Sequence, residues 1–323
     1  MSPAVPDGFQ IIATLGPSSF GRAKALAAAG ATGFRLNASH LRPAELRSAV
    51  ESLRRELPGA RLTIDLQGAK MRLGHFRERA LFKEQVVIFT SETDRRTAVP
   101  LPHPEIFGAA RVGDTLTADD GRLRFTILEV TPTALVGSAV EDGVLKPRKG
   151  INLEEHPVEL DDLTGDDEQH LASVEAPKAA SWAFSFMKDG REAGWLRRRV
   201  EGCRVVAKIE RQEAIDALPQ IARAVDELWI CRGDLGEQLG PTRLARFVAG
   251  FSPKSAGVPV LMAGQVLEHL TEHPEPTRSE VCHLYDLVSR GYAGIVLSDE
   301  TAIGRNPERA VARAASLVHG FRG

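Results

Sequence analysis

Two short apolar runs in the second half of the chain end in charged residues. The first reads VVAKIE and contains Lys208 and Glu210, and the second reads ELWICRGDLG and contains Arg232 and Asp234. Runs of this length are typical of buried parallel strands. Two carboxylates can hold Mg²⁺ or Mn²⁺ with positions left for substrate oxygens, and an adjacent lysine suits an anionic substrate bound to that metal.

The segment between these runs, residues 211–225, has apolar residues at helical spacing. A strand, a helix and a second strand in this order favour parallel neighbours, which brings both charged ends to one edge of a sheet. A simpler alternative stays open at this point. Glu210 and Asp234 can serve only to pair with Lys208 and Arg232 at the strand ends.

Length and charge restrict the classes of protein that fit. The 323 residues suit one α/β barrel with an insertion better than two independent domains. A formal charge of -2 gives no electrostatic case for binding nucleic acid or a membrane. No apolar stretch approaches about 18 residues and the N-terminus does not resemble a signal peptide, so we expect a cytoplasmic protein. The three cysteines lack metal-binding spacing, and we expect free thiols.

Eight segments with strand character alternate with helical stretches along most of the chain. They lie at residues 9–14, 32–40, 61–65, 181–186, 204–209, 227–231, 258–263 and 294–298. Eight such units predict a closed (β/α)₈ TIM barrel, which carries its active site at the carboxyl ends of the strands.

A different pattern interrupts the alternation after the third strand. Short alternating runs at residues 85–90, 122–130 and 134–140 are separated by turn-forming clusters. We expect a small antiparallel β-barrel at residues 74–150 that acts as a lid. The barrel domain is then formed by residues 1–73 and 151–323.

Ordered motifs along the chain resemble those of the pyruvate kinase family. They are Thr14–Ser19, Phe34–His40, Asp119–Gly121, Arg148–Leu153, Ala207–Glu210, Arg232–Gly236, Pro276–Glu280 and Leu297–Ala302. The resemblance covers that family's catalytic barrel and lid. It implies phosphoryl transfer between phosphoenolpyruvate and ADP to give pyruvate and ATP, with Mg²⁺ or Mn²⁺ as cofactor. Because the chain ends soon after the last barrel helix, control through the family's C-terminal domain is not expected.

The resemblance also implies roles for individual residues. It assigns catalysis to Lys208, Arg35 and the position of Gly264; substrate binding to Gly233, Asp234, Arg35 and Lys208; the nucleotide to Asn37, His40, Arg72 and Lys149; the divalent metal to Glu210 and Asp234; and lid closure to Lys149 and Asp120. In potassium-dependent members, the positions of Asn37, Ser39, Asp65 and Leu66 form the monovalent-cation site.

The sequence departs from the family at positions that bear on function. Gly264 stands where the family has a threonine associated with carboxylate binding and proton delivery, so we expect slow protonation of the enol. Leu66 and Lys70 replace a threonine and a glutamate that many members have, as in the subset that works without potassium, so K⁺ should not be required. The segment VCHLYD after Glu280 replaces small and acidic residues, and either specificity or subunit packing changes with it.

Three functions therefore remain open at the level of sequence. The first is an active phosphotransferase that acts on phosphoenolpyruvate or a close analogue. The second is a non-catalytic or regulatory relative that binds nucleotide or an enolate. The third is a metal-dependent lyase or aldolase that stabilises a pyruvate enolate. The partners expected are small-molecule substrates, and a homo-oligomer is one alternative for the assembly.

Overall fold

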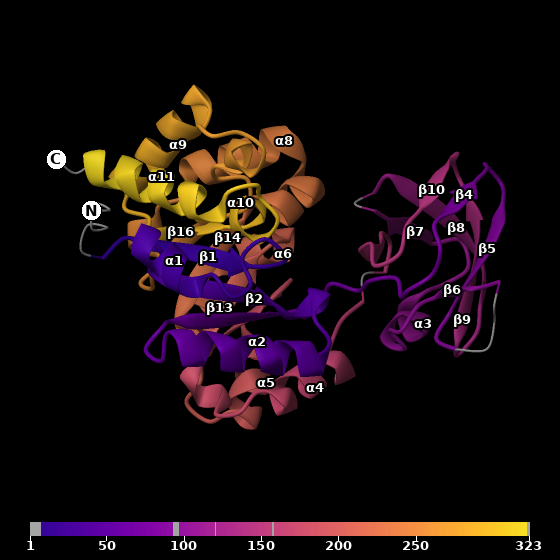
Figure 1. Ribbon diagram of the computed structural model, residues 1–323. Helices are drawn as coiled ribbons and strands as arrows, with labels where there is room; N and C mark the ends of the chain where they lie inside the picture. The colour runs from indigo at the N-terminus through magenta and orange to yellow at the C-terminus, as the bar shows by residue number, and fades with distance from the viewer. Residues whose placement is uncertain (1–7, 93–96, 120, 157, 322–323) are drawn as a thin grey trace. The chain divides into compact units, whose positions relative to one another are not determined.

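The computed structural model describes residues 8–92, 97–119, 121–156 and 158–321 (Figure 1). The chain divides into two compact units. The barrel unit consists of Met1–Gln67 and Leu163–Gly323, and the inserted unit consists of Gly68–Asp162. The inserted unit extends past both ends of the expected residues 74–150, and on its C-terminal side β11 (Ile151–Leu153) pairs with a strand of the insertion.

A closed barrel of eight parallel strands forms the centre of the barrel unit, as the sequence predicts. In order around the barrel the strands are β1 (Gln10–Leu15), β2 (Gly33–Asn37), β3 (Leu62–Leu66), β12 (Ser181–Phe184), β13 (Arg204–Ile209), β14 (Glu227–Cys231), β15 (Val260–Ala263) and β16 (Gly294–Leu297). All eight strands are buried almost throughout, which explains why their sequences are continuous apolar runs.

Apolar side chains from six consecutive strands, β12 to β16 and β1, fill part of the barrel. One buried cluster contains Ile12, Ala183, Val206, Trp229, Leu261 and Val296, together with Cys231 and Ala263. Trp229 also donates a hydrogen bond of 2.7 Å from Nε1 to Glu227, whose other carboxylate oxygen lies 2.6 Å from Arg61. Packing and paired charges therefore fix the barrel below the carboxyl ends of its strands.

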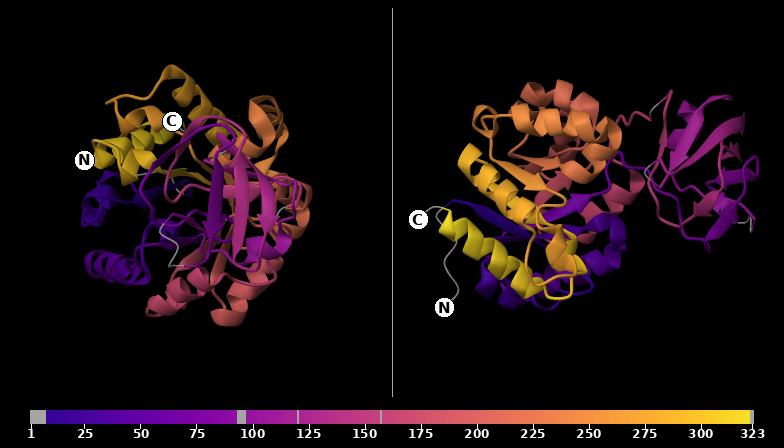
Figure 2. Two further views of the ribbon diagram at one scale, coloured as in Figure 1. Left: turned by 90° about the vertical axis from the view of Figure 1, so that its right-hand side faces the viewer. Right: turned by 90° about the horizontal axis from the view of Figure 1, so that it is seen from above.

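Helices connect successive strands around the outside of the barrel. They are α1 (Ala23–Ala29), η1 (Ala38–His40), α2 (Pro43–Glu56), α4 (Gly165–Ser173), η2 (Pro177–Ala179), α5 (Arg191–Arg199), α6 (Gln212–Asp216), α7 (Leu218–Ala224), α8 (Arg232–Gly250), η3 (Pro253–Ser255), η4 (Glu268–Thr271), α9 (Arg278–Arg290), α10 (Asp299–Ala302) and α11 (Pro307–Gly320). Helices α1 and α11, from opposite ends of the chain, lie side by side (Figures 1 and 2).

The helical segment expected at residues 211–225 is divided in two. Helix α6 ends at Asp216, and α7 begins at Leu218 with a proline in its first turn. Proline lacks the N–H that a continuous helix needs at this point, but it suits the start of a new helix. Within the described residues, no helix has the length and apolar character needed to span a bilayer.

The inserted unit contains two sheets where one small barrel was expected. A six-stranded sheet has the order β11, β7 (Thr115–Ala118), β8 (Leu123–Val130), β9 (Ala134–Ala139), β5 (Val86–Thr90) and β6 (Val99–Pro100), and a separate pair is formed by β4 (Arg79–Leu81) and β10 (Gly143–Leu145). The pairing is antiparallel except between β5 and β6. Helix α3 (Glu105–Ala109) lies between β6 and β7 in the sequence.

Candidate active site

Lys208, near the end of β13, lies at the centre of a buried group of charged side chains. Its Nζ is 3.1 Å from Asp65 Oδ2 on β3 and 3.0 Å from Glu210 Oε1. It also donates a hydrogen bond of 2.8 Å to Ser185 Oγ, just after β12. Strands β3, β12 and β13 are consecutive in the barrel, so their parallel pairing brings these carboxyl ends together.

Arg35 on β2 adds a second cation to this group. Its Nε and Nη2 lie 2.8 and 2.6 Å from the same oxygen, Asp65 Oδ2. Its Nη1 donates to Thr14 Oγ1 at 3.2 Å. The guanidinium is therefore held in a fixed orientation from two neighbouring strands, which is a suitable arrangement for receiving an oxyanion.

Charges in this cluster strongly affect one another. Burial opposes the charge of Lys208, but the carboxylates of Asp65 and Glu210 outweigh it and raise the pKa of the ammonium. For Asp65, burial opposes ionisation, yet Lys208 and Arg35 lower the pKa of the carboxyl. Lys208, Arg35 and Asp65 therefore favour their charged forms, and the two cations are held in a site of low dielectric.

Glu210 and Asp234 are the two carboxylates expected to hold a divalent metal. Burial raises the pKa of Glu210 to about 7, with a further contribution from the nearby carboxyl of Asp234. Two carboxyl groups placed together in this way favour a bound proton or a metal cation between them. Glu210 Oε1 is buried and makes no geometrically sound hydrogen bond, although it lies close to the lysine.

The donor set at Glu210 and Asp234 fits a hard divalent cation. Among the described residues no group of three or more His, Cys, Asp or Glu side chains is arranged to hold a metal. Two carboxylates would leave the remaining positions for oxygens of substrate and water, which is usual for Mg²⁺. The backbone N–H of Phe186 donates a hydrogen bond of 2.8 Å to Glu210 Oε2 and orients this carboxylate.

Arg232 does not serve as a simple ion-pair partner at the end of β14. Its Nε and Nη2 donate to the carbonyl oxygen of Gly264 at 3.1 and 2.9 Å, and Nη2 also donates to the carbonyl of Gln265. Its Nη1 lies 2.9 Å from Nε2 of His283 on α9. The ion pair between Lys208 and Glu210 that the simpler alternative expects is present, whereas Arg232 binds carbonyl oxygens of the loop after β15.

The backbone at Gly264 explains why glycine occupies this position. Its φ is +75°, and φ at the next residue, Gln265, is +54°. A Cβ at residue 264 would lie 3.3 Å from the backbone nitrogen of Gly233. A β-branched residue such as threonine is strongly disfavoured in this left-handed conformation. The loop therefore differs from one that presents a threonine hydroxyl to a substrate.

Other predicted residues of the barrel unit lie at the ends of β2, β3 and β14. Asn37 accepts hydrogen bonds from the backbone N–H and the hydroxyl of Ser39 at 3.2 and 2.7 Å. His40 is exposed at the end of η1, and Leu66 is buried. Gly233 and Asp234 lie in the first turn of α8, where helix N–H groups lack intrahelical acceptors.

Three predicted residues belong to the inserted unit and one lies outside the described residues. Arg72 donates from Nη1 to the carbonyl of Arg148 at 3.1 Å. Lys149 is 2.7 Å from Asp119 in an ion pair, and Lys70 is partly buried. The position of Asp120 is not among the described residues.

Ser185 and Phe186 have contacts that residue type did not reveal. Ser185 Oγ lies 3.1 Å from Asp65 Oδ1 and 2.8 Å from the carbonyl of Leu66, in addition to its contact with the lysine. Phe186 has a φ of +57°, which turns its N–H toward Glu210. A serine after a buried strand is a weak signal by itself, because serines are common in such loops, and the resemblance to the family placed Ser185 and Phe186 near the active site without indicating their contacts.

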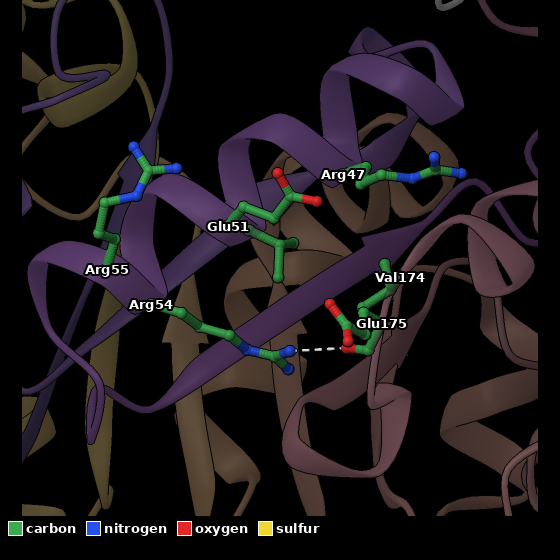
Figure 3. Close-up of a pocket in the computed structure, with 7 residues that line it drawn as sticks. Arg47, Glu51, Arg54, Arg55, Val174 and Glu175 are labelled. Carbon is green, nitrogen blue, oxygen red and sulfur yellow. Dashed lines mark hydrogen bonds between the residues drawn. The ribbon is translucent and has the colours of Figure 1, made fainter.

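An outer pocket of about 340 Å³ lies between α2 and the segment after α4. It is lined by Arg47, Val50, Glu51, Arg54, Arg55, Val174 and Glu175 (Figure 3). Arg54 donates to the carbonyl of Glu175 at 2.6 Å, whereas the guanidinium groups of Arg47 and Arg55 point away from each other (Figure 3). These arginines do not converge on a common point, so the pocket is not arranged to bind an anion.

Comparison with known proteins gives a family for this arrangement. Residues 8–311 match the family described as "Pyruvate kinase, barrel domain". The chain belongs to the pyruvate kinase family. A pyruvate kinase of Agrobacterium vitis is 32% identical over 327 residues, which cover 96% of this chain and 68% of that protein.

Other members of the pyruvate kinase family show similar levels of identity. The Methylorubrum extorquens protein is 32% identical over 319 residues, with 94% of this chain and 66% of the relative covered. The Aeropyrum pernix protein is 31% identical over 324 residues, with 95% and 69% covered. The chain thus spans about two thirds of the length of these curated relatives.

Proposed function

We propose that this protein transfers a phosphoryl group between phosphoenolpyruvate, or a close analogue, and ADP, giving pyruvate and ATP. The observation that supports this most directly is the buried cluster of Arg35, Asp65, Lys208 and Glu210 at the carboxyl ends of three barrel strands. Phosphoryl transfer depends on positioned charge more than on covalent participation of the protein. Fixed cations beside carboxylates that suit a divalent metal meet that requirement.

Arg35 and Lys208 carry the electrostatic part of the proposed reaction. The bond between phosphorus and the enol oxygen breaks while a bond to the terminal oxygen of ADP forms. Lys208 would neutralise negative charge on the moving group, and Arg35 would orient its oxygens. The ion pairs of both residues with Asp65 keep these cations in place before substrate arrives.

Glu210 and Asp234 would hold the divalent metal of the proposed reaction. Bound Mg²⁺ or Mn²⁺ supplies Lewis-acid neutralisation of the phosphoryl and enolate oxygens. The N–H groups of Gly233 and Asp234 in the first turn of α8 would receive the substrate carboxylate. Nucleotide contacts are proposed for Asn37 and His40 in the barrel unit, and for Arg72 and Lys149 in the inserted unit.

The proton that converts the enolate to pyruvate is proposed to come from water. Gly264 has no hydroxyl, and its carbonyl oxygen accepts hydrogen bonds from Arg232. A carbonyl oxygen cannot donate a proton. Phosphoryl transfer should therefore be faster than protonation of the enolate at C3, and exchange of the methyl protons of pyruvate should be slow.

Activity without potassium is also proposed. A bound K⁺ needs oxygen ligands, but Leu66 offers no side-chain oxygen, and Asp65 Oδ2 already receives Arg35 and Lys208. Two unit charges about 4 Å apart repel by about 4 kcal/mol at an effective dielectric near 20, so a further cation at this carboxylate is disfavoured. The resemblance assigns a compensating charge to Lys70, which belongs to the inserted unit.

A second candidate function is metal-dependent cleavage or formation of a carbon–carbon bond through a pyruvate enolate. The observation in its favour is Gly264, because a site without a proton donor beside the enolate preserves this intermediate. A non-catalytic relative that only binds nucleotide or enolate is the third outcome of the test.

Initial rates of pyruvate and ATP formation from phosphoenolpyruvate and ADP, with Mg²⁺ or Mn²⁺, test the proposal directly. Equal rates of formation of the two products support phosphoryl transfer. Metal-dependent binding of ADP without either product would favour the non-catalytic alternative. Exchange of pyruvate protons together with aldehyde-dependent loss of pyruvate, and no ATP, would favour the lyase or aldolase.

A further inference from the structure

The imidazole of His170 on α4 lies between two backbone carbonyl oxygens. Its Nδ1 is 2.7 Å from the carbonyl oxygen of Asp166, and its Nε2 is 2.8 Å from the carbonyl oxygen of Leu41. Carbonyl oxygens only accept hydrogen bonds, and a neutral imidazole carries a single N–H. The ring can therefore donate to both carbonyls only when both nitrogens are protonated.

Leu41 connects this contact to the candidate active site. It directly follows η1 and donates its own N–H to the carbonyl of Ala38 at 3.0 Å. Asn37 ends β2, and Ser39 and His40 lie in η1, directly before Leu41. The bond from His170 therefore fastens the loop after β2 to α4, and all of these residues belong to the barrel unit.

Helix α4 is also attached to the end of β3. The side chain of Asp167 accepts a hydrogen bond of 3.1 Å from the N–H of Gln67, two residues after Asp65. Its N-cap Thr164 accepts from the N–H of Asp167 at 3.2 Å. The buried face of α4 thus supports the ends of two strands that carry the cationic cluster, and His170 holds one of the two.

Several charged groups lie on α4 and on the elements packed against it. The first turn of the helix contains Asp166, Asp167 and Glu168, and Glu168 pairs with Arg199 of α5 at 2.6 Å. His170 lies in the last turn, where the helix dipole favours positive charge. From α2, Arg47 donates to the carbonyl of Ser173 at 3.0 Å, and from the loop after β2, His40 is exposed.

Another side chain also joins α2 to the segment after α4, and its charge does not change near neutral pH. Arg54, drawn in Figure 3, donates to the carbonyls of Glu175 and Ala176. Arginine stays protonated throughout the physiological range. Histidine is the side-chain type whose charge can change between about pH 5 and pH 8, and His170 is the histidine that joins α4 to the loop after β2.

We propose that His170, as an imidazolium, is a positioning residue that holds the loop after β2 in the form that binds ADP, and that loss of one proton weakens this binding. The inference rests on the proposed function for its kinetic consequence. A neutral ring can donate to the carbonyl of Asp166 or to that of Leu41, but not to both. The bond to Leu41 joins two different elements, so it is the one that can open. Activity would then decrease as pH rises, through KM for ADP and not through kcat.

Two conservative variants separate the two bonds. In His170→Gln the amide nitrogen takes the place of Nε2 and keeps the bond to Leu41, whereas in His170→Asn it takes the place of Nδ1 and keeps only the bond to Asp166. Both amides are neutral and do not titrate. His319→Gln, an exposed position at the end of α11, is the matched control.

KM for ADP and kcat would be measured for these proteins from about pH 6 to about pH 9, the range over which free histidine loses its proton. The wild type should show KM rising roughly 3- to 10-fold relative to His170→Gln, which corresponds to one lost hydrogen bond. His170→Asn should show the raised KM at every pH. His319→Gln should follow the wild type.

Parallel KM profiles for the wild type and His170→Gln would overturn the inference. Nitrogen-15 NMR of the wild type gives a test that needs no activity: both ring nitrogens of His170 should carry protons at about pH 6. A single protonated nitrogen there would also overturn it.

Hydrogen exchange keeps this inference separate from the proposed function. After correction for the intrinsic pH dependence, protection of the Ser39 and Leu41 amides should fall with rising pH in the wild type and stay constant in His170→Gln. If no phosphoryl transfer is found but this pattern is seen, the proposed function fails and the role of His170 in holding the loop stands. Unchanged protection in the wild type would contradict that role.

Discussion

The ends of β13 and β15 lie on the same side of one barrel but are built in different ways. At β13, Lys208 and Glu210 place charged side chains in a buried cluster. At β15, Gly264 and Gln265 turn backbone carbonyls toward Arg232. The first region depends on residue type and the second on backbone conformation. Substitutions in the two regions should therefore fail for different reasons.

The largest effect is expected at the charge cluster. Lys208→Met should lower kcat roughly 100- to 1,000-fold, because a charge at the transferred group is lost. It should also destabilise the fold by about 3–5 kcal/mol, because Asp65 and Glu210 lose a buried partner. Steady-state kinetics and urea unfolding measure the two effects. Lys24→Met, on the exposed side of α1, is the control and should change neither.

The metal ligands come next in expected size. Glu210→Gln or Asp234→Asn should lower the rate at least about 100-fold and weaken Mn²⁺ binding, because one charged ligand is removed. Calorimetric titration with Mn²⁺ measures the affinity directly. Asp216→Asn, exposed on α6, provides a matched loss of charge. If both site variants kept the metal affinity and rate of the wild type, these carboxylates would be structural.

Substitutions in the loop after β15 should change stability through the backbone conformation and not through charge. Gly264→Thr should destabilise the protein by about 1–3 kcal/mol, because a β-branched residue is forced into a left-handed conformation. Gly194→Ala, inside α5 where a Cβ would lie 3.9 Å from Nη1 of Arg198, should be neutral or slightly stabilising. Thermal unfolding compares the two. A Gly264→Thr protein as stable as the wild type, with faster proton exchange of pyruvate, would show that the loop readily accepts a hydroxyl.

The pH dependence of stability should distinguish the loop from the cluster. Burial, followed by the charge of Arg232, lowers the pKa of His283 from its ordinary value of 6.5 to about 4. The unfolded chain therefore binds this proton more readily than the folded chain. The stabilising contribution is complete above pH 6.5 and is lost as pH falls toward about 4.

The comparison of wild type with His283→Gln isolates this contribution from the carboxylates that titrate in the same range. Urea midpoints would be measured between those two pH values. The wild type should lose more stability on acidification than the variant, which retains a neutral acceptor for Arg232. Equal losses would show that protonation of His283 does not weaken the loop.

The smallest expected response is to potassium, which probes the cluster again. Replacing tetramethylammonium by about 100 mM K⁺ at constant ionic strength should leave the initial rate unchanged, because general screening is held equal. The double variant Leu66→Thr and Lys70→Glu should gain a requirement for the ion. Activation of the wild type by more than about threefold, a measurable change in the barrier, would contradict potassium independence.

Sequence was most informative where a residue's chemistry determines its surroundings. Continuous apolar runs of this length fit strands that are buried on both faces, and eight of them in alternation with helical stretches predicted the closed barrel that the structure has. The placement of Lys208 beside Glu210 follows from their spacing of two residues at the carboxyl end of β13. Their meeting with Arg35 and Asp65 follows from the parallel order of the barrel.

Tertiary structure decided what side-chain identity leaves open. A glycine at residue 264 indicated a missing hydroxyl, but only the folded structure showed its left-handed backbone and the binding of its carbonyl by Arg232. The sequence suggested that Arg232 pairs with a carboxylate. Its contacts are instead with the carbonyl of Gly264 and the ring of His283. Backbone torsions and long-range hydrogen bonds depend on which segments the folded barrel brings together. Local sequence fixes residue types and periodicity, and it does not specify these distant partners.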